Sequence, residues 1–309
     1  MKAYKLIFVF IILLFTSCAS NKTNEIQNST TSMVNDSEDF NITYNNIAGN
    51  ESLNRVIDLL KGKISNESLN TFINDVKDYS NIVKDLNDNF IVKNELPEYD
   101  LVKITGQLES SNSDYYGNNC RITTYGLINE FISLDSVKEI PDNLIFDNDS
   151  LSHSNKFDKK YINKFNALYK QIDTEKTKDL NVHLNNIKNY FKKINLKFNL
   201  PENFSVISVF FHDDINENAH KLFVGHTGLL IKDNDDYYFI EKLSFELPYQ
   251  VVKFKNRDEL NTYLMTMYNT SWGQETADPI IIENDDLLKE YKVIKNTNAK
   301  YGKTPYFAF

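Results

Sequence analysis

Apolar residues recur with two different periods along this chain, and the change of period separates two groups of predicted elements. Between Ser52 and Ile194 they return every three or four residues, which is the spacing of a buried helix face. Between Phe204 and Phe254 they form short runs rich in β-branched and aromatic residues, separated by loops rich in Asp and Asn. Helices that precede an antiparallel sheet predict an α+β fold.

The individual elements follow from the apolar stripes and from polar residues that suit helix caps. We predict helices around residues 53–60, 69–76, 120–133, 157–168 and 180–194. Asn256 and Glu259 have the spacing of a capping box and open a further predicted helix that reaches Tyr268. We predict extended segments at residues 100–105, 204–211, 222–231, 237–243, 249–254, 280–282 and 291–294.

The N-terminal residues have the pattern of an export signal. Lys2 and Lys5 are positively charged, and residues 6–15 that follow are all apolar. A run of this length is too short to span a bilayer, which needs about 20 residues, but it suits a signal peptide. Thr16 and Ser17 then stand directly before Cys18, so that this stretch resembles the lipobox of bacterial lipoproteins.

This pattern predicts a signal peptide over residues 1–17, a disordered tether over 18–45 and one globular α+β domain over 46–309. The tether is rich in Asn, Ser and Thr and poor in apolar residues. We expect cleavage before Cys18 and attachment to the extracytoplasmic face of a bacterial membrane through lipid on that cysteine. The alternative is an ordinary secretory signal that happens to contain a cysteine.

Charge and cysteine content narrow the choice of partners. The formal net charge is −9, which argues against nucleic acid as a partner. We expect a monomer without a cofactor or a bound metal. The chain has two cysteines, and lipid on Cys18 would leave Cys120 unpaired. Since exported proteins usually pair their thiols, a lone thiol calls for burial, an anaerobic habitat or chemistry.

Cys120 stands where its thiol would be activated. Asn118 and Asn119 are candidate caps for a helix that begins at the cysteine. The unpaired N–H groups of a helix start and the positive charge of Arg121 both favour a thiolate. Tyr115 and Tyr116 precede this segment and are candidates for an aromatic wall beside the thiol or, equally, for anchors of the loop.

A histidine and a carboxylate are predicted to meet on the following sheet. His226 lies between Gly225 and Gly228 at the start of a predicted strand. If residues 233–236 form the hairpin turn, Glu241 on the next strand lies on the same sheet face as His226. Such a carboxylate would fix the tautomer of the imidazole, as the third member of a nucleophile, base and orienter set does.

The order of these residues resembles that of papain-like cell-wall peptidases of the NlpC type. The resemblance implies a cysteine-bearing helix packed on an antiparallel sheet, here with an added N-terminal helical layer, and cleavage of cell-envelope peptides. Cys120 would be the nucleophile, His226 the general base and Glu241 the orienter. The substrate side would include Tyr115, Tyr116 and Arg121. No obvious glutamine that could donate a hydrogen bond to the oxyanion precedes Cys120. The third residue of the set is Glu241, where these peptidases more often have His, Asn or Gln.

A second resemblance covers most of the mature chain. Residues 119–124, 225–228 and 239–242, with 72–76 and 248–250, are similar to an uncharacterised bacterial lipoprotein family catalogued as domain of unknown function 4300. The resemblance implies a protein that is tethered outside the cytoplasm, and it assigns no activity.

Other interpretations remain open. Cys120 as a buried structural residue would leave a non-catalytic lipoprotein that binds envelope peptide or an envelope protein. A metal-binding lipoprotein would use His212 and His220, with Asp213 and Asp214 beside them, although this spacing matches no fixed ligand pattern. His153 and His183 have no evident partners in the sequence.

Overall fold

Long runs of β-branched and aromatic residues build the two central strands, β6 (Phe204–Asn216) and β7 (Ala219–Asp233). They pair antiparallel along most of their length, with a bulge after Val209. β8 (Asp236–Lys242) continues from the hairpin turn, and Lys232 lies opposite Tyr237 as the turn position predicts. β9 (Tyr249–Phe254) pairs with β8 in turn.

The computed structural model describes residues 41–111, 116–153, 157–216, 219–269 and 273–294. They fall within one compact unit, Asp39–Phe309. The predicted signal peptide, most of the predicted tether, and Tyr115 lie outside the described residues. Within the described ranges, no helix has both the length and the apolar character needed to cross a membrane.

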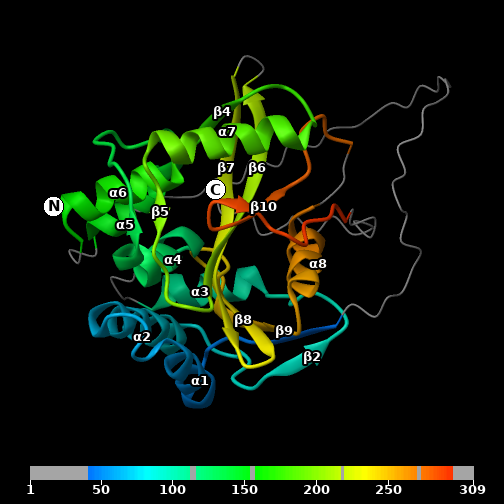
Figure 1. Cartoon of the computed structure of the whole chain (residues 1–309). Helices are drawn as coiled ribbons and strands as arrows, with labels where there is room; N and C mark the ends of the chain where they lie inside the picture. Colours follow the sequence, from blue (N-terminus) through cyan, green and yellow to red (C-terminus); the bar gives the residue numbers. More distant parts are fainter. Residues whose placement is uncertain (1–40, 112–115, 154–156, 217–218, 270–272, 295–309) are drawn as a thin grey trace. The chain divides into compact units, whose positions relative to one another are not determined.

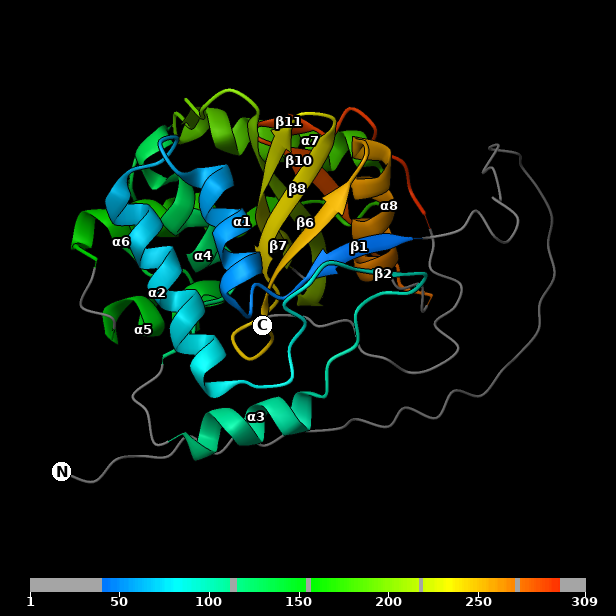
Figure 2. The same cartoon turned by 90° about the horizontal axis from the view of Figure 1, so that it is seen from below.

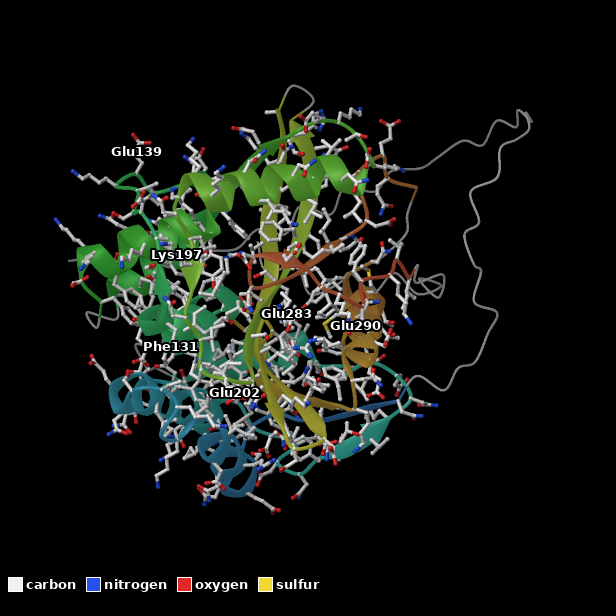
Figure 3. The ribbon with its side chains drawn as sticks, viewed as in Figure 1. Phe131, Glu139, Lys197, Glu202, Glu283 and Glu290 are labelled. Atoms are coloured by element: carbon white, nitrogen blue, oxygen red, sulfur yellow. The ribbon has the colours of Figure 1, made fainter. Side chains whose placement is uncertain are left out.

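In this part of the chain nine strands form the main sheet (Figure 1). Their order is β11-β10-β6-β7-β8-β9-β1-β2, and β4 pairs with β7 beyond the end of β8. The remaining strands of this sheet are β1 (Ile42–Asn45), β2 (Ile91–Lys93), β4 (Ile172–Thr174), β10 (Ile280–Glu283) and β11 (Asp286–Leu287). A separate two-stranded sheet consists of β3 (Ile132–Ser133) and β5 (Lys197–Phe198). Figure 3 labels Phe131, the residue before β3, and Lys197, the first residue of β5.

Most helices begin at a polar residue whose side chain accepts a backbone N–H of the first turn. Ser65, Asn119 and Asn256 do so at three of the predicted helices. The helices are α1 (Asn50–Leu60), α2 (Asn66–Ile82), α3 (Leu101–Ser110), α4 (Cys120–Ile128), α5 (Ile145–His153), α6 (Lys159–Tyr169), α7 (Leu180–Lys193) and α8 (Arg257–Tyr268). Two 3-10 turns are Asn129–Phe131 and Asp142–Leu144.

The helices cover the sheet unequally. Figures 1 and 2 show α1, α2, α4 and α6 on one side of the strands and α8 on the other. α4 packs against β7 and β8, and α8 packs against β9. An ion pair also fastens α8 to β10, since Arg257 Nη2 lies 2.7 Å from Oε1 of Glu283, which Figure 3 labels. The helix that carries Cys120 is therefore held directly on the sheet.

The α+β class and the antiparallel sheet are confirmed, but the simple order of helices before strands is wrong. β1 and β2 come from the N-terminal part and extend the sheet beyond β9, as Figure 2 shows. The domain boundary predicted at residue 46 therefore lies too late, because the sheet already includes Ile42. Long-range pairing of this kind leaves no local signal in the sequence.

Three further predictions of elements are wrong. Residues 100–105 are helical, because Asp100 accepts the N–H of Lys103 and caps α3. The helix from Cys120 ends at Ile128 instead of residue 133, and β3 follows the 3-10 turn. Residues 291–294 form no strand.

We predict that Gly228→Ala destabilises the fold by about 1–3 kcal/mol, the usual cost of overpacking. A Cβ at this position would lie 2.5 Å from the ring of Phe239 and 2.8 Å from the carbonyl oxygen of Ile240, and backbone cannot move aside cheaply. Gly106→Ala is the matched control, because a Cβ there meets nothing within 4 Å and alanine suits α3. Urea unfolding of both variants measures the difference, and equal midpoints would contradict the prediction.

Candidate functional site

Cys120 occupies the first position of α4, as the sequence predicts. Asn119 caps the helix, since its side-chain oxygen accepts the N–H of Ile122 at 3.0 Å. The amide nitrogen of Asn119 donates to Oδ1 of Asp147 on α5 at 2.8 Å. The cap therefore ties the start of the cysteine helix to a neighbouring helix and fixes where the thiol points.

A buried ion pair reinforces this connection. Arg121 donates through Nε to Oδ1 of Asp147 at 2.9 Å and through Nη2 to Oδ2 at 2.8 Å. The exposed fractions of the two side chains are 3% and 1%. The same guanidinium donates through Nη1 to the carbonyl of Val224 at 3.0 Å, two residues before His226. Arg121 thus links the segment of the thiol to the strand of the imidazole.

His226 lies on β7 just beyond its last pair with β8, which is Gly228 with Glu241. Its Nε2 lies 2.5 Å from Oε2 of Glu241 and donates to that carboxylate. The predicted register and the predicted contact between the two side chains are therefore confirmed. The ring of Tyr268 stacks on the imidazole, with centroids 5.0 Å apart.

Glu241 is held by two further donors. Its Oε1 accepts from Tyr263 Oη at 2.6 Å and from Gln250 Nε2 at 2.7 Å. Gln250 in turn accepts from Tyr99 Oη at 2.8 Å. Three donors fix the direction of the Glu241 carboxylate, so Glu241 can orient the imidazole and stabilise its charged form.

The thiol faces both the imidazole and the strand backbone. Since Nε2 of His226 is bound to Glu241, Nδ1 is the ring nitrogen left to hydrogen-bond the sulfur of Cys120. The N–H of Thr227 also donates to the sulfur. Cysteine, imidazole and carboxylate therefore form one continuous chain of hydrogen bonds.

Two opposing effects act on the pKa values of Cys120 and His226. Burial raises the pKa of the Cys120 thiol, but the hydrogen bond and charge of His226, with the charge of Arg121, outweigh it and hold that pKa below its ordinary value. Burial likewise lowers the pKa of His226, and its bonds to Cys120 and Glu241 raise it above the ordinary range instead. Both shifts favour a thiolate paired with an imidazolium.

This site is closed in the structure. Cys120 and Glu241 have an exposed fraction of 0% and His226 one of 1%. Tyr268 and Thr227 beside them are buried as well. A close approach contributes to the seal, because a Cβ at Gly225 would lie 1.9 Å from the ring of Phe211. A substrate can reach the sulfur only after neighbouring side chains or segments move.

Lys242, next to Glu241, is a charged residue that sequence reasoning left without a role. It is fully buried, and its Nζ lies 4.3 Å from the ring centre of Tyr79 and 5.1 Å from that of Tyr249. Its ammonium donates to the backbone carbonyls of Ser244, Phe245 and Leu247. Burial lowers the pKa of Lys242 to about 7. The side chain anchors the loop between β8 and β9, which precedes Gln250.

The residues predicted on the substrate side are dispersed. Tyr116 is half exposed and stacks on His153 of α5, with ring centroids 3.8 Å apart. Arg121 is buried, and its guanidinium is occupied by Asp147, so the structure assigns it a positioning role in place of the predicted substrate contact. Asp147 itself was missed, because α5 lacks a clear apolar stripe.

Three histidines gather elsewhere in the fold. The ring of His212 lies 4.7 Å from that of His183 and 5.7 Å from that of His220. His212 Nδ1 accepts the N–H of Ala277, so the neutral ring carries its proton on Nε2 and offers no lone pair there. Among the described residues, no group of three or more His, Cys, Asp or Glu side chains is arranged to hold a metal ion.

We predict that Asp147→Asn lowers the free energy of unfolding by about 3–5 kcal/mol, because it leaves the buried charge of Arg121 uncompensated. Asp149→Asn is the control on the same helix. Its side chain is 64% exposed, so little change is expected. Chemical unfolding followed by fluorescence compares the two, and similar losses in both variants would contradict the role of the ion pair.

Comparison with known proteins identifies a family whose description names no activity. A family model described as Domain of unknown function (DUF4300) matches residues 43–288. No curated protein and no solved structure matches the chain. The matched range includes Cys120, His226 and Glu241 and covers far more than half of the sequence. The chain therefore belongs to the family of the domain of unknown function DUF4300.

Proposed function

We propose that this protein is a cysteine hydrolase that cleaves peptide or amide bonds in the cell envelope. One observation carries the proposal. Cys120 lies at a helix start and is hydrogen-bonded to His226, whose other ring nitrogen donates to Glu241 at 2.5 Å. This is the arrangement of nucleophile, base and orienter that papain-like enzymes of the NlpC type share.

The reaction would begin from the ion pair. The Cys120 thiolate attacks the substrate carbonyl carbon, and the electron pair of the C=O bond moves onto oxygen. The intermediate collapses, the C–N bond breaks, and the proton of the His226 imidazolium passes to the leaving nitrogen. Water then attacks the thioester, gives a proton back to His226 and releases the thiolate. Glu241 keeps its hydrogen bond to the ring and stabilises the imidazolium whenever it forms.

The seal around the sulfur favours a second candidate, a non-catalytic envelope-binding lipoprotein. A fully buried cysteine is a common structural residue, and the same hydrogen bonds would then serve to compensate buried polar groups. The two functions differ in one property of the resting protein. An enzyme has a thiolate that reagents reach during transient opening, whereas a structural thiol stays inert.

We also propose that the protein is exported and anchored by lipid on Cys18, facing the outside of a bacterial membrane. Support comes from the lysines and the apolar run that precede Thr16-Ser17-Cys18. Because the sequence has two cysteines, lipid on Cys18 would leave Cys120 as a free thiol. A tethered hydrolase would meet envelope peptides close to that membrane.

We predict that iodoacetamide alkylates Cys120 fast already at about pH 7, below the ordinary pKa of a thiol, because the thiol pKa is lowered. In His226→Ala the imidazolium is lost while burial still raises the thiol pKa. The rate at about pH 7 should fall at least ~10-fold and climb only as the pH approaches the ordinary thiol value. Mass spectrometry after timed labelling measures both pH profiles.

His153→Ala is the control for this measurement, because that histidine is partly exposed and contacts Tyr116. Its profile should follow that of the unmodified sequence. A thiol that reacts only at alkaline pH in the unmodified protein would exclude the hydrolase and leave the non-catalytic function.

We predict that Cys18→Ser abolishes lipid attachment and the associated processing in a bacterial host, because only the sulfur can carry the diacylglycerol. Metabolic labelling with a radioactive fatty acid, with and without globomycin, measures this. Ser20→Ala, two residues further on, is the control and should be processed normally. Unchanged labelling of the Cys18→Ser protein would point to an ordinary secretory signal or to another anchor.

A further inference from the structure

The hydroxyl of Tyr169 is buried without a hydrogen-bond partner in the described part of the chain. Tyr169 ends α6 and has an exposed fraction of 2%. A buried polar atom without a partner costs about 1–3 kcal/mol, so its presence in a packed interior needs an explanation. A phenylalanine would fill the same space without that cost.

This phenol interacts electrostatically with the thiol. Its strongest electrostatic neighbour is Cys120, followed by Arg121. Its ring packs against Tyr125 of α4 at 6.5 Å between centroids and against Phe165 at 5.0 Å. The backbone is held too, since the Tyr169 carbonyl accepts Asn143 Nδ2 at 3.1 Å. These contacts hold Tyr169 in place against Tyr125 of α4.

Thiolate attack needs hydrogen-bond donors for the oxygen that becomes negative. The first N–H groups of a helix have no partner within that helix, so the N–H of Cys120 offers one donor. A second donor has to come from a side chain whose own hydrogen is unpaired. Burial raises the pKa of Tyr169 well above its ordinary value, which keeps the phenol protonated and able to donate.

We propose that the hydroxyl of Tyr169 donates a hydrogen bond to the oxyanion of the acyl substrate attacked by Cys120. This inference rests on the proposed hydrolase function and deepens it. The electron pair of the substrate C=O bond moves onto its oxygen, Tyr169 and the Cys120 N–H stabilise that oxygen, and the phenol proton stays on Tyr169. When the intermediate collapses, the C=O bond re-forms and the hydroxyl returns to its unpartnered state.

Two reagents with different requirements test this role in the full chain. Alkylation by iodoacetamide displaces iodide and forms no oxyanion, whereas acetyl transfer from p-nitrophenyl acetate to the sulfur passes through one. We predict that Tyr169→Phe slows acetylation of Cys120 by about 100-fold, the usual effect of one oxyanion donor, and leaves alkylation unchanged. Since both reagents must reach the same sulfur, the ratio of the two rates cancels the effect of opening.

Tyr161→Phe is the matched control. Its hydroxyl also has no hydrogen-bond partner among the described residues, but its electrostatic neighbours are Tyr125, Tyr169 and Asp75 and do not include Cys120. Both rates should stay unchanged in this variant. Each substitution removes a single oxygen that makes no hydrogen bond, so thermal unfolding should show a folded protein in both cases.

The outcomes separate the two proposals. An unchanged ratio of acetylation to alkylation in Tyr169→Phe would overturn the oxyanion role and leave Cys120 as nucleophile. An equal slowing in Tyr161→Phe would also overturn it, because the packing of the aromatic cluster would then matter instead of one hydroxyl. An unmodified protein whose Cys120 is alkylated only at alkaline pH and never acetylated would overturn the hydrolase function itself.

Discussion

This structure depends on two buried pairs of charged side chains, one on each side of the contact between α4 and the sheet. Arg121 and Asp147 pair at the start of α4, while His226 and Glu241 pair on β7 and β8, and all four side chains are almost fully buried. An unpaired charge in such a place costs several kcal/mol, so none of these groups tolerates loss of its partner. The geometry of the site and the stability of this region are therefore set by the same contacts.

The seal around Cys120 has consequences for reactivity. Attraction between a thiolate and an imidazolium is strongest where water is excluded, and here it outweighs the cost of burying the two charges. Opening would admit water and weaken the attraction, and the binding of a substrate would have to offset that loss. Such a design would keep the thiol protected until a ligand displaces the cover. The same seal without opening describes a structural polar centre, which is why reactivity of the resting thiol decides between the two functions.

Local chemistry explains which parts of the site the sequence predicts. Asn119 is a local signal of the helix start, because its side chain accepts a backbone N–H of the first turn. The hairpin turn after β7 sets the register that brings Glu241 to His226. The partners supplied from distant segments leave no such trace. Asp147 lies on a helix with little periodicity, and the addition of β1 to the sheet depends on pairing with β9, some 200 residues later along the chain. The segment at residues 100–105 shows the opposite error, because its capping aspartate, Asp100, is a local helix signal that the prediction of an extended segment overlooked.

Four of the five segments that carry the family resemblance converge on this polar centre. Residues 119–121 supply the cap, the thiol and the guanidinium, residues 225–228 supply the imidazole, and residues 239–242 supply its carboxylate. Gln250, in the fourth segment, fixes that carboxylate from β9. These segments come from one helix and three strands, and no local structural requirement forces them to share a sequence pattern. Their meeting at one buried thiol makes this chain of hydrogen bonds the place where a role for the protein has to be sought.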